Sequence, residues 1–585
     1  MKRFIPLFTK NLLIAAMSFA SMEAMAATDL VLFNGKIFTA DRAQPKVQAL
    51  AVENGKVLKV GSDAQIKALI EPGTQVIDLK GQALMPGLID SHSHAIFGGL
   101  EMVSANMEDE VVGLDELEKR LRGWRDDGKA RHGDVLSVAG MSSAYWAKAE
   151  ALGKIFNNGE WTDVPVVFTG SDHHTAWANN VMLKRAGIDA ALLKTLPDAE
   201  KDTLGKLANG EPNGFVVDAG WDRVASKMPV PSPADMLKAA QSAVRFNNSL
   251  GITAWMDPAA NAAPGEPVFA LKPTEKTVGV LPAYKALSES GGMTAHVAAL
   301  LVANPKSVPA DLDTLDKVRR QFQGIPNLTL PGIKIFADGV IEYPAQSAAM
   351  IDPYSNSHKQ GELLIDPQHF GELVSAIDQR GWLVHIHAIG DRAVRESLNG
   401  IAQARKDRQS GVTHSITHLQ MVNPKEFARF KPLNVIASMQ LLWASADDYT
   451  TDMIKPYVSA LAFRYQYPAH SLLKQGATIA GASDWPVSSP NPWNAMAQAI
   501  TRTGPLGVLN ADERLDRETM FYAYTANAAR TIGLEQQIGS LSPGKQADFI
   551  VLDRDVFSVD DKALHDTQVL QTWFAGRQVY APTLQ

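Results

Sequence analysis

The middle of the chain alternates between two hydrophobic patterns. After Ser232 and Pro233, apolar residues recur every three or four positions as far as Val244. This spacing predicts a helix with Ser232 as its N-cap and proline in its first turn. Gly251 then ends the helix, and the apolar run 252–256 predicts a buried strand.

Similar helix–strand units recur along the chain. Asp366-Pro367 and Asn423-Pro424 each open a further predicted helix. The predicted strands lie near residues 84–91, 251–257, 294–301, 332–338, 382–387, 413–418, 434–439 and 477–483. Because helices that connect consecutive strands make those strands parallel, this pattern predicts an α/β fold, a closed (β/α)8 TIM-like barrel.

Both ends of the chain have a different pattern, that of short strands. Apolar stretches near the N-terminus are separated by turns, including Asn-Gly dipeptides at 34–35 and 54–55, which predict hairpins. Residues 548–552 and 569–575 give comparable strands near the C-terminus. Two strand-rich ends predict one small composite β-sandwich domain formed by both termini.

The chain is therefore divided into a few predicted parts. These are a signal peptide (1–26), the composite β-sandwich (27–83 and 530–585) and the barrel (84–529). Residues 100–235 form a large insertion, or lid, after barrel strand 1, and contain strands near 135–140 and 165–171.

The first 26 residues have the features of an export signal. Lys2 and Arg3 precede the apolar run 11–20, and Ala24 and Ala26 supply the small residues that a signal peptidase recognises. The run is too short to span a bilayer comfortably, and an uncleaved membrane anchor is the alternative interpretation. We expect cleavage after Ala26 and a periplasmic or secreted protein without a stable membrane anchor.

The composition restricts which residues can bind a metal and which partners the protein can have. The 585 residues include no cysteine, so a metal ion must be held by histidine, carboxylate or modified lysine. The net charge is −7 without a basic block, which argues against a nucleic-acid partner. We expect a small-molecule substrate, and the composition is compatible with a homo-oligomer.

Two histidines follow the first predicted barrel strand. His92 and His94 stand two positions apart after the apolar stretch PGLID, so their side chains point to the same face. Barrel enzymes assemble their sites at this end of the strands, and paired imidazoles are common metal ligands. The alternative, a pair of solvated loop histidines, does not explain the preceding strand.

Later strands end in groups that can complete a metal site. His387 and His418 close two of these strands, and Asp484 follows the last one. His385 and His414 lie deeper in the same two strands, where we expect a structural role. We predict His387, His418 and Asp484 as ligands.

Lys334 occupies the middle of an apolar strand. A buried charged lysine is costly unless it is paired. One solution is addition of carbon dioxide to its amine, which gives a carbamate that bridges two metals. The other is an ion pair with Asp338, Glu342 or Asp484.

The ordered motifs MPGLIDSHSH, KIFADG, HIHAIGDRAV, ITHLQ, GASDWPV and TANAARTIGLEQQIGSLSPGKQADFIVLD resemble the amidohydrolase superfamily. More narrowly, they are similar to the amidohydrolase family 3 branch that includes N-substituted formamide deformylases. The resemblance covers nearly the whole mature chain. It implies a metal-dependent hydrolase with the metal ligands His92, His94, Lys334, His387, His418 and Asp484.

The resemblance also implies a role for each ligand. His92 and His94 bind the first metal, His387 and His418 the second, and a carboxylated Lys334 bridges them. Asp484 contacts the first metal and accepts the proton of the bound water. We expect one or two divalent metals per chain, with Zn²⁺ as the first choice, and Asp338 and Asp391 as candidates to orient the histidines.

Two further residues are singled out by the same comparison. Thr417 stands where the resemblance leads us to expect an acidic residue. This difference should alter either a hydrogen bond that orients a metal ligand or the substrate preference. His174, in the insertion, is predicted to hydrogen-bond the scissile carbonyl or its oxyanion, and a structural loop histidine is the alternative.

The expected pocket has an aromatic lining and a lid. The insertion and residues 344–360 are predicted to form the lid. The candidate aromatic residues are Trp146, Trp177, Trp443 and Tyr449. Aromatic residues are more often part of a hydrophobic core, which is the alternative here.

The predicted function is hydrolysis of a non-peptide C–N bond, in an amide, formamide or cyclic amide, by a metal-activated hydroxide with Asp484 as general base. The alternatives are an esterase or lactonase that uses the same site, and a non-catalytic metal-binding scaffold with the same fold.

Overall fold

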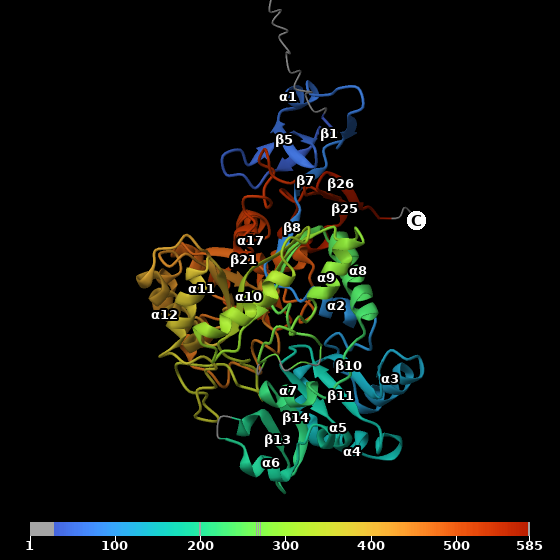
Figure 1. The fold of residues 1–585 in the computed structure, drawn as a ribbon, viewed down its shortest axis with the longest axis vertical. Helices are drawn as coiled ribbons and strands as arrows, with labels where there is room; N and C mark the ends of the chain where they lie inside the picture. The colour runs from blue at the N-terminus through green and yellow to red at the C-terminus, as the bar shows by residue number, and fades with distance from the viewer. Residues whose placement is uncertain (1–27, 198–199, 265, 267, 269–270, 583–585) are drawn as a thin grey trace, which may run out of the picture.

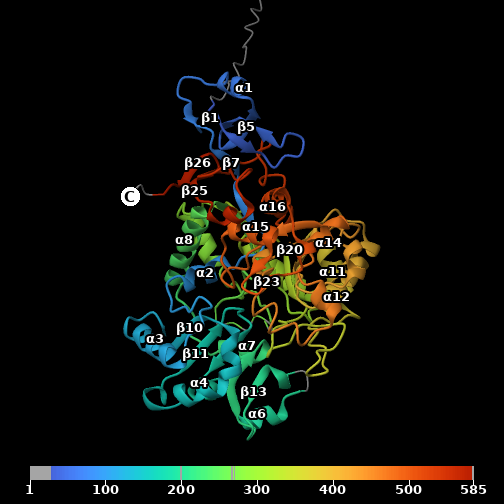
Figure 2. The same ribbon diagram turned by 180° about the vertical axis from the view of Figure 1, so that it is seen from behind.

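The structure, a computed structural model, describes residues 28–197, 200–264, 266, 268 and 271–582. The predicted signal peptide lies outside these residues. Along the long axis, a small β domain, a barrel and a third, mixed domain follow one another (Figures 1 and 2). No helix of the described residues combines the length and apolarity needed to cross a membrane.

The central domain is a parallel barrel. Its strands are β8 (Leu88–Asp90), β15 (Ile252–Asp257), β16 (His296–Val302), β17 (Leu328–Phe336), β18 (Leu383–Ala388), β19 (His414–His418), β20 (Val435–Met439) and β21 (Thr478–Gly481). Neighbouring strands pair in parallel in this order. The ring closes where the Ser91 amide donates to the carbonyl of Gly481 at 3.0 Å. The predicted barrel is confirmed.

Helices connect these strands on the outside of the barrel (Figure 1). The helices are α2 (Ala95–Glu101), α8 (Pro233–Ser249), α9 (Leu281–Glu289), α10 (Leu312–Gln321), α11 (Phe370–Gln379), α12 (Asp391–Asp407), α13 (Ala460–Arg464), α14 (Ala469–Lys474), α15 (Pro492–Thr501), α16 (Arg517–Ala523) and α17 (Ala526–Thr531). Ser232 caps α8 as predicted, since its hydroxyl accepts from the Asp235 amide. The helix predicted at Asn423-Pro424 is a short 3₁₀ helix, Pro424–Arg429.

The first barrel strand differs from its prediction. The run 84–91 is two strands: β7 (Ala83–Pro86) joins the β domain, and β8 (Leu88–Asp90) joins the barrel. Gly87 separates them, and a Cβ atom there would lie 2.1 Å from Thr253 Oγ1. The chain therefore passes from one domain to the other within a single apolar run, which no change of polarity marks.

The β domain contains strands from both termini, as predicted. A four-stranded sheet has the order β5-β4-β1-β6, and a six-stranded sheet has the order β26-β25-β24-β7-β2-β3. The strands are β1 (Leu30–Phe33), β2 (Lys36–Phe38), β3 (Lys46–Val47), β4 (Ala49–Glu53), β5 (Lys56–Gly61), β6 (Gln75–Asp78), β24 (Phe549–Leu552), β25 (Val569–Phe574) and β26 (Arg577–Tyr580). Leu32 and Leu50 of the first sheet and Phe549 and Trp573 of the second share one core.

Only one of the two predicted Asn-Gly hairpins is present. Asn54 and Gly55 join the antiparallel strands β4 and β5, both with positive φ. Asn34 also has a positive φ, but the strands on either side of it belong to different sheets. The same dipeptide therefore serves as a crossover between the two layers of the sandwich.

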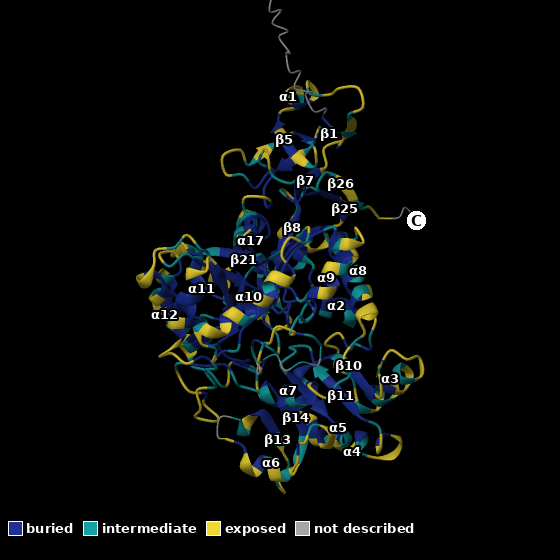
Figure 3. Ribbon diagram, in the orientation of Figure 1, coloured by how far each residue is buried: buried dark blue, intermediate teal, exposed yellow. Residues whose placement is uncertain are grey.

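The insertion folds around its own sheet, of order β13-β14-β12-β11-β10-β9. Its strands are β9 (Arg131–His132), β10 (Val135–Met141), β11 (Val166–Gly170), β12 (Thr175–Ala178), β13 (Leu204–Lys206) and β14 (Pro212–Val217), and its helices are α3 (Leu114–Asp126), α4 (Ala149–Phe156), α5 (Asn180–Arg185), α6 (Ala190–Thr195) and α7 (Ala219–Ala225). Figure 3 shows the central strands of this sheet as buried. Trp146 and Trp177 lie in this core, so the prediction that they line the pocket is wrong.

Candidate active site

Three predicted ligands converge at the C-terminal end of the barrel. His92 and His94 follow β8, and Asp484 follows β21, so ring closure brings them together. Asp484 Oδ1 lies 3.1 Å from His92 Nε2 and 3.4 Å from His94 Nε2. The three donor atoms lie within 4.8 Å of one another, which makes this group able to hold a metal ion.

The donor atoms also fit a metal chemically. Asp484 is 6% exposed, and its Oδ1 atom, although close to His92 Nε2 and His94 Nε2, forms no hydrogen bond with a described residue. A buried carboxylate oxygen without a donor is costly, and a metal ion would satisfy it. Burial alone raises the pKa of Asp484, but its contacts with His92 and His94 outweigh this effect and hold the pKa well below its usual range. The ionised form is the one that binds metal.

Asp90, the last residue of β8, connects the two loops that carry these ligands. Its carboxylate accepts the His92 amide at 3.1 Å and the Ser483 amide at 3.0 Å. The Asp484 amide in turn donates to the carbonyl of His92 at 2.8 Å. Burial raises the pKa of Asp90 to about 7. Asp90 was not predicted, although a polar residue that ends a buried strand was a signal for it.

His385 orients the His92 ring through the nitrogen that faces away from Asp484. His92 Nδ1 lies 2.6 Å from His385 Nε2, and His385 Nδ1 lies 2.6 Å from Ser415 Oγ. These contacts leave His92 Nε2 to face Asp484. His414 instead contacts Asp378 at 3.0 Å, away from the site. Both histidines are buried and structural, as expected.

His387 and His418 lie beside the first group. Their ring centroids are 4.5 Å apart, and His418 Nδ1 is 3.8 Å from Asp484 Oδ2. Burial lowers the pKa of both rings well below its usual range, and it lowers that of His92 to about 3. The neutral imidazoles that result are the form that binds metal.

Gln440 contacts both His418 and Thr417, and so gives Thr417 an indirect role in the site. Gln440 Oε1 lies 3.1 Å from His418 Nδ1, and its Nε2 donates to Thr417 Oγ1 at 3.2 Å. The threonine hydroxyl therefore orients an amide that contacts a candidate ligand. Gln440 follows β20 and was not predicted, because an isolated glutamine carries no spacing signal.

Lys334 lies in the floor of the same site. It pairs in register with His385 on the adjacent strand and is 1% exposed. Burial lowers the pKa of its amine to about 7. The structure contains no ion pair within 4.0 Å between Lys334 and a described carboxylate, so the predicted alternative is absent. Its Nζ lies 4.8 Å from the centroid of the Phe336 ring.

The two aspartates expected to orient histidines behave differently. Asp338 accepts the backbone amides of Ala349, Ile389 and Gly390, and its Oδ1 lies 3.6 Å from His387 Nε2. His387 Nε2 is closer to the carbonyl of Gly339, at 3.0 Å. Asp391 accepts the Ile351 amide and contacts no histidine ring, so that prediction is wrong.

The insertion places His174 opposite the barrel ligands. Its ring centroid is 5.3 Å from that of His387, and its Nδ1 lies 2.7 Å from Asp218 Oδ1. Burial lowers the pKa of His174, but Asp218 outweighs this effect and the net pKa is raised. Asp218, which was not predicted, has a positive φ of 47°. Asp218 therefore favours the charged form of the imidazole that lies beside His387.

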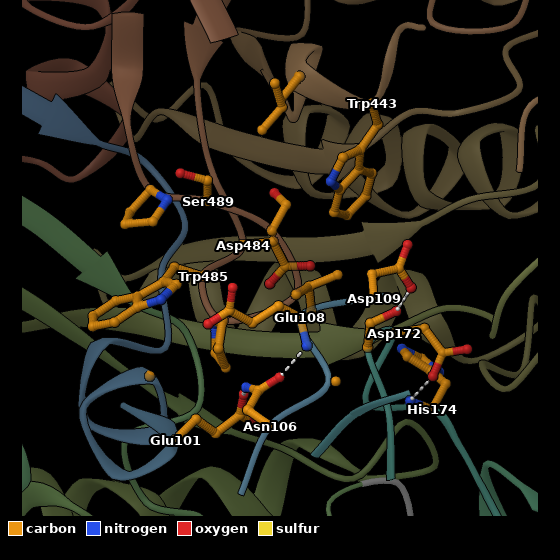
Figure 4. A pocket seen from close by; sticks show the side chains of 18 of the residues that line it. Glu101, Asn106, Glu108, Asp109, Asp172, His174, Trp443, Asp484, Trp485 and Ser489 are labelled. Carbon is orange, nitrogen blue, oxygen red and sulfur yellow. Dashed lines mark hydrogen bonds between the residues drawn. The ribbon is translucent and has the colours of Figure 1, made fainter. Parts of the chain in front are cut away.

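A cavity of about 920 Å³ between the barrel and the insertion is lined by His174, His387, His418 and Asp484 (Figure 4). The same four residues also line an adjoining cavity of about 890 Å³, to which His92, His94 and Lys334 belong. Trp443 and Tyr449 line the first cavity as predicted, and the Trp443 ring stacks on His418 at 5.7 Å. The insertion contributes a wall, including Asp109 and Asp172, which is consistent with a lid. Residues 344–360 line neither this cavity nor the adjoining one, and their role as a lid stays a prediction.

A (β/α)8 barrel with histidines and an aspartate gathered at the C-terminal ends of its strands defines the class of metal-dependent barrel hydrolases. The chain belongs to the amidohydrolase family, whose model matches residues 75–580. This finding confirms the resemblance of the motifs, and members of this family depend on metal.

Individual relatives agree with this assignment. The chain is 30% identical to Protein LONG AFTER FAR-RED 3 of Arabidopsis thaliana, over 94% of this chain and 91% of the relative. It is 22% identical to N-substituted formamide deformylase of Arthrobacter pascens, over 95% of this chain and 99% of the relative. An uncharacterized metal-dependent hydrolase of Pyrococcus horikoshii has a similar structure, with a TM-score of 0.68 and 25% sequence identity. The match covers 91% of this chain and 99% of that hydrolase.

Proposed function

We propose that this protein is an exported hydrolase that cleaves a non-peptide C–N bond in an amide, formamide or cyclic amide. The observation that carries the proposal is the convergence of His92 Nε2, His94 Nε2 and Asp484 Oδ1, where Asp484 lines both adjoining cavities. The similarity to an N-substituted formamide deformylase supports an amide substrate.

The residues present suit one or two Zn²⁺ ions. His92, His94 and Asp484 would hold the first, and His387 with His418 the second. A bound divalent metal supplies a Lewis acid and lowers the pKa of water to about 7. In our proposal, the neutral Lys334 amine would add to carbon dioxide: an N–C bond forms as one C=O π bond opens, and the proton lost from nitrogen passes to water. The resulting carbamate would supply oxygen ligands to the two metals. The lowered pKa of Lys334 supports this reaction, because the neutral amine is the nucleophile.

The protein's own groups then move the proton and hold the substrate. Asp484 accepts a proton from the attacking water and passes it to the leaving nitrogen. His174 donates a hydrogen bond to the carbonyl oxygen, where negative charge develops during attack. Asp218 orients His174 and raises its pKa, which favours the protonated form that donates this hydrogen bond. The insertion covers the reacting atoms and limits the access of bulk water.

The test combines elemental analysis, intact mass and turnover. We expect about two zinc ions per chain with an added ~44 Da, and hydrolysis of members of an amide panel. A single metal without added mass would restrict the site to His92, His94 and Asp484. Turnover of esters or lactones alone would favour the esterase alternative, and metal without any turnover would favour a scaffold. A mature N-terminus at Ala27 in the periplasmic fraction would support export.

A further inference from the structure

The cavity wall is strongly acidic. Six carboxylates besides Asp484 line it: Glu101, Glu108, Asp109, Asp172, Glu342 and Asp447. Lys129 is the one lysine or arginine among its described lining residues. A cavity lined by one sign of charge, with walls of low dielectric constant, attracts ligands of the opposite sign.

These carboxylates have few cationic partners within the protein. Glu101 lies 3.2 Å from His173 Nε2, and it is the one member of the six with an ion pair to a described residue. Asp109, Asp172, Glu342 and Asp447 accept hydrogen bonds from neutral donors. The Tyr449 hydroxyl donates to Asp109 at 2.6 Å, and the Gln420 amide donates to Glu342 at 3.0 Å. Neutral donors orient these carboxylates without neutralising them.

Four of the six lie close enough to repel one another. Burial raises the pKa of Asp109, and the charges of Asp172 and Asp447 raise it further. Burial also raises the pKa of Glu342, with Asp172 again adding to the effect. Like charges held together in a partly desolvated wall are unfavourable unless a counter-charge binds between them.

The six carboxylates of the cavity wall are better placed to bind an organic cation than a further metal ion. In the described part of the chain, His92, His94 and Asp484 are the one group of three or more histidines or carboxylates whose donor atoms converge on a metal position, and no member of the acidic wall belongs to it. The acidic wall is therefore spread along the cavity. Trp443 and Trp485 also line it, and aromatic faces stabilise organic cations. Figure 4 shows Asp484 between these two rings.

We propose that the substrate is an amide that carries a protonated amine or guanidinium group, which binds against Asp172, Glu342 and Asp447. This inference rests on the proposed function and names its substrate class. Asp484 Oδ1, which lies beside His92 Nε2 and His94 Nε2, marks the reacting end of the same cavity. The cationic group lies at the acidic wall while the scissile carbonyl lies at the metal group.

The experiment compares three amides of matched length and different charge. They are N-acetyl-1,4-diaminobutane (cationic), N-pentylacetamide (neutral) and N-acetyl-5-aminopentanoate (anionic). We expect kcat/KM to fall in that order, by about tenfold or more at each step, as charged hydrogen bonds are lost or replaced by repulsion. Glu342→Gln should reduce the preference for the cationic over the neutral amide by about tenfold, mainly through KM.

Glu211→Gln is the matched control, because Glu211 is exposed on the insertion and lies outside the cavity. It should keep the wild-type preference. Asp447→Asn provides a second test if Glu342→Gln does not fold. Equal kcat/KM for the cationic and neutral amides would overturn this inference and leave the proposed function intact.

If no amide is hydrolysed, the proposed function fails but the inference is still decided by binding. Calorimetric titration of the metal-loaded wild type with N-acetyl-1,4-diaminobutane and with N-pentylacetamide then compares the two affinities. Preference for the cation by about tenfold or more would support the inference. Equal affinities, or preference for the neutral compound, would overturn it.

Discussion

His385 Nε2 lies 2.6 Å from His92 Nδ1, so a histidine from the fifth strand of the barrel sheet orients one from the first. Ser415, on the next strand, holds the other nitrogen of His385. The contact determines which nitrogen of His92 faces Asp484. A group that orients a metal ligand through its other ring nitrogen commonly affects metal affinity as much as activity.

We therefore expect His385→Phe to lower metal affinity by about 10- to 100-fold, because His92 loses the group that orients it. Competition with a chelator, read by elemental analysis, measures this change. His470→Phe, at an exposed histidine, is the control and should keep wild-type affinity. Unchanged affinity in His385→Phe would show that the contact is only a packing interaction.

Asp484→Asn should reduce kcat by about 10²- to 10⁴-fold, because the amide cannot accept the proton of water. The fold should persist, since the Asp484 backbone amide still donates to His92. Circular dichroism and metal content accompany the rate measurement. Asp115→Asn, at an exposed aspartate, should keep full activity. Retention of more than a tenth of the rate would remove Asp484 from the role of general base.

The carbamate on Lys334 predicts a dependence on bicarbonate. Metal-free protein reconstituted with Zn²⁺ should reach about two metals per chain only when bicarbonate is present, because the bridging group needs carbon dioxide. Lys334→Met should bind about one metal with or without bicarbonate. Elemental analysis provides the measurement. Bicarbonate-independent loading of the wild type would argue for an unmodified lysine.

Gln440→Leu should weaken metal binding or turnover by about 10- to 100-fold, since His418 loses the group that contacts its Nδ1. Thr417→Val should have a smaller effect in the same direction, because it removes only the acceptor of the Gln440 amide. Chelator competition and kcat/KM provide the measurements. A larger effect in Thr417→Val than in Gln440→Leu would contradict this order of contacts.

Asp378 predicts a stability change at low pH. It contacts Arg405 Nη1 at 2.7 Å and His414 Nε2 at 3.0 Å. Burial raises its pKa, but the hydrogen bonds from His414 and Ser410 and the charge of Arg405 outweigh this and lower the pKa to about 2. Because its folded pKa lies below the unfolded value of 3.8, its stabilisation is complete above about pH 5 and is lost as the pH falls through 2.

Asp378→Asn should therefore lower the free energy of unfolding by about 3 kcal/mol at pH 7, since it leaves Arg405 buried without its partner. The difference from the wild type should shrink between about pH 5 and pH 1. Urea unfolding at each pH measures both effects. Asp163→Asn, at an exposed aspartate, is the control. A constant difference across this range would show that Asp378 is not the titrating group.

Much of the fold could be read from local pattern. The barrel strands stood out as continuous apolar runs ended by glycine or proline, because both faces of a barrel strand are buried. His92, His94, His387 and His418 stood out because alternate residues of a strand share a face and the site lies at one end of the strands. Asp484 was found because it follows the last of these runs.

The partners of these residues could not be read in this way. Asp90 contacts Ser483 from 393 positions away, and Asp218 contacts His174 from 44 positions away. Trp146 and Trp177 looked like candidates for the pocket until the insertion proved to have a core of its own. The boundary at Gly87 also escaped prediction, since both strands beside it are buried and apolar.

The sequence by itself determined the elements, their parallel order and the residue types available as ligands, because hydrophobic period and turn residues act within a few positions. Tertiary structure alone decided which nitrogen of His92 faces Asp484, which carboxylates form the acidic wall, and which tryptophans reach the cavity. Each of these contacts exists only when the barrel closes and the insertion packs over it. Barrel closure brings together residues that are far apart along the chain, and no local pattern in the sequence predicts such contacts.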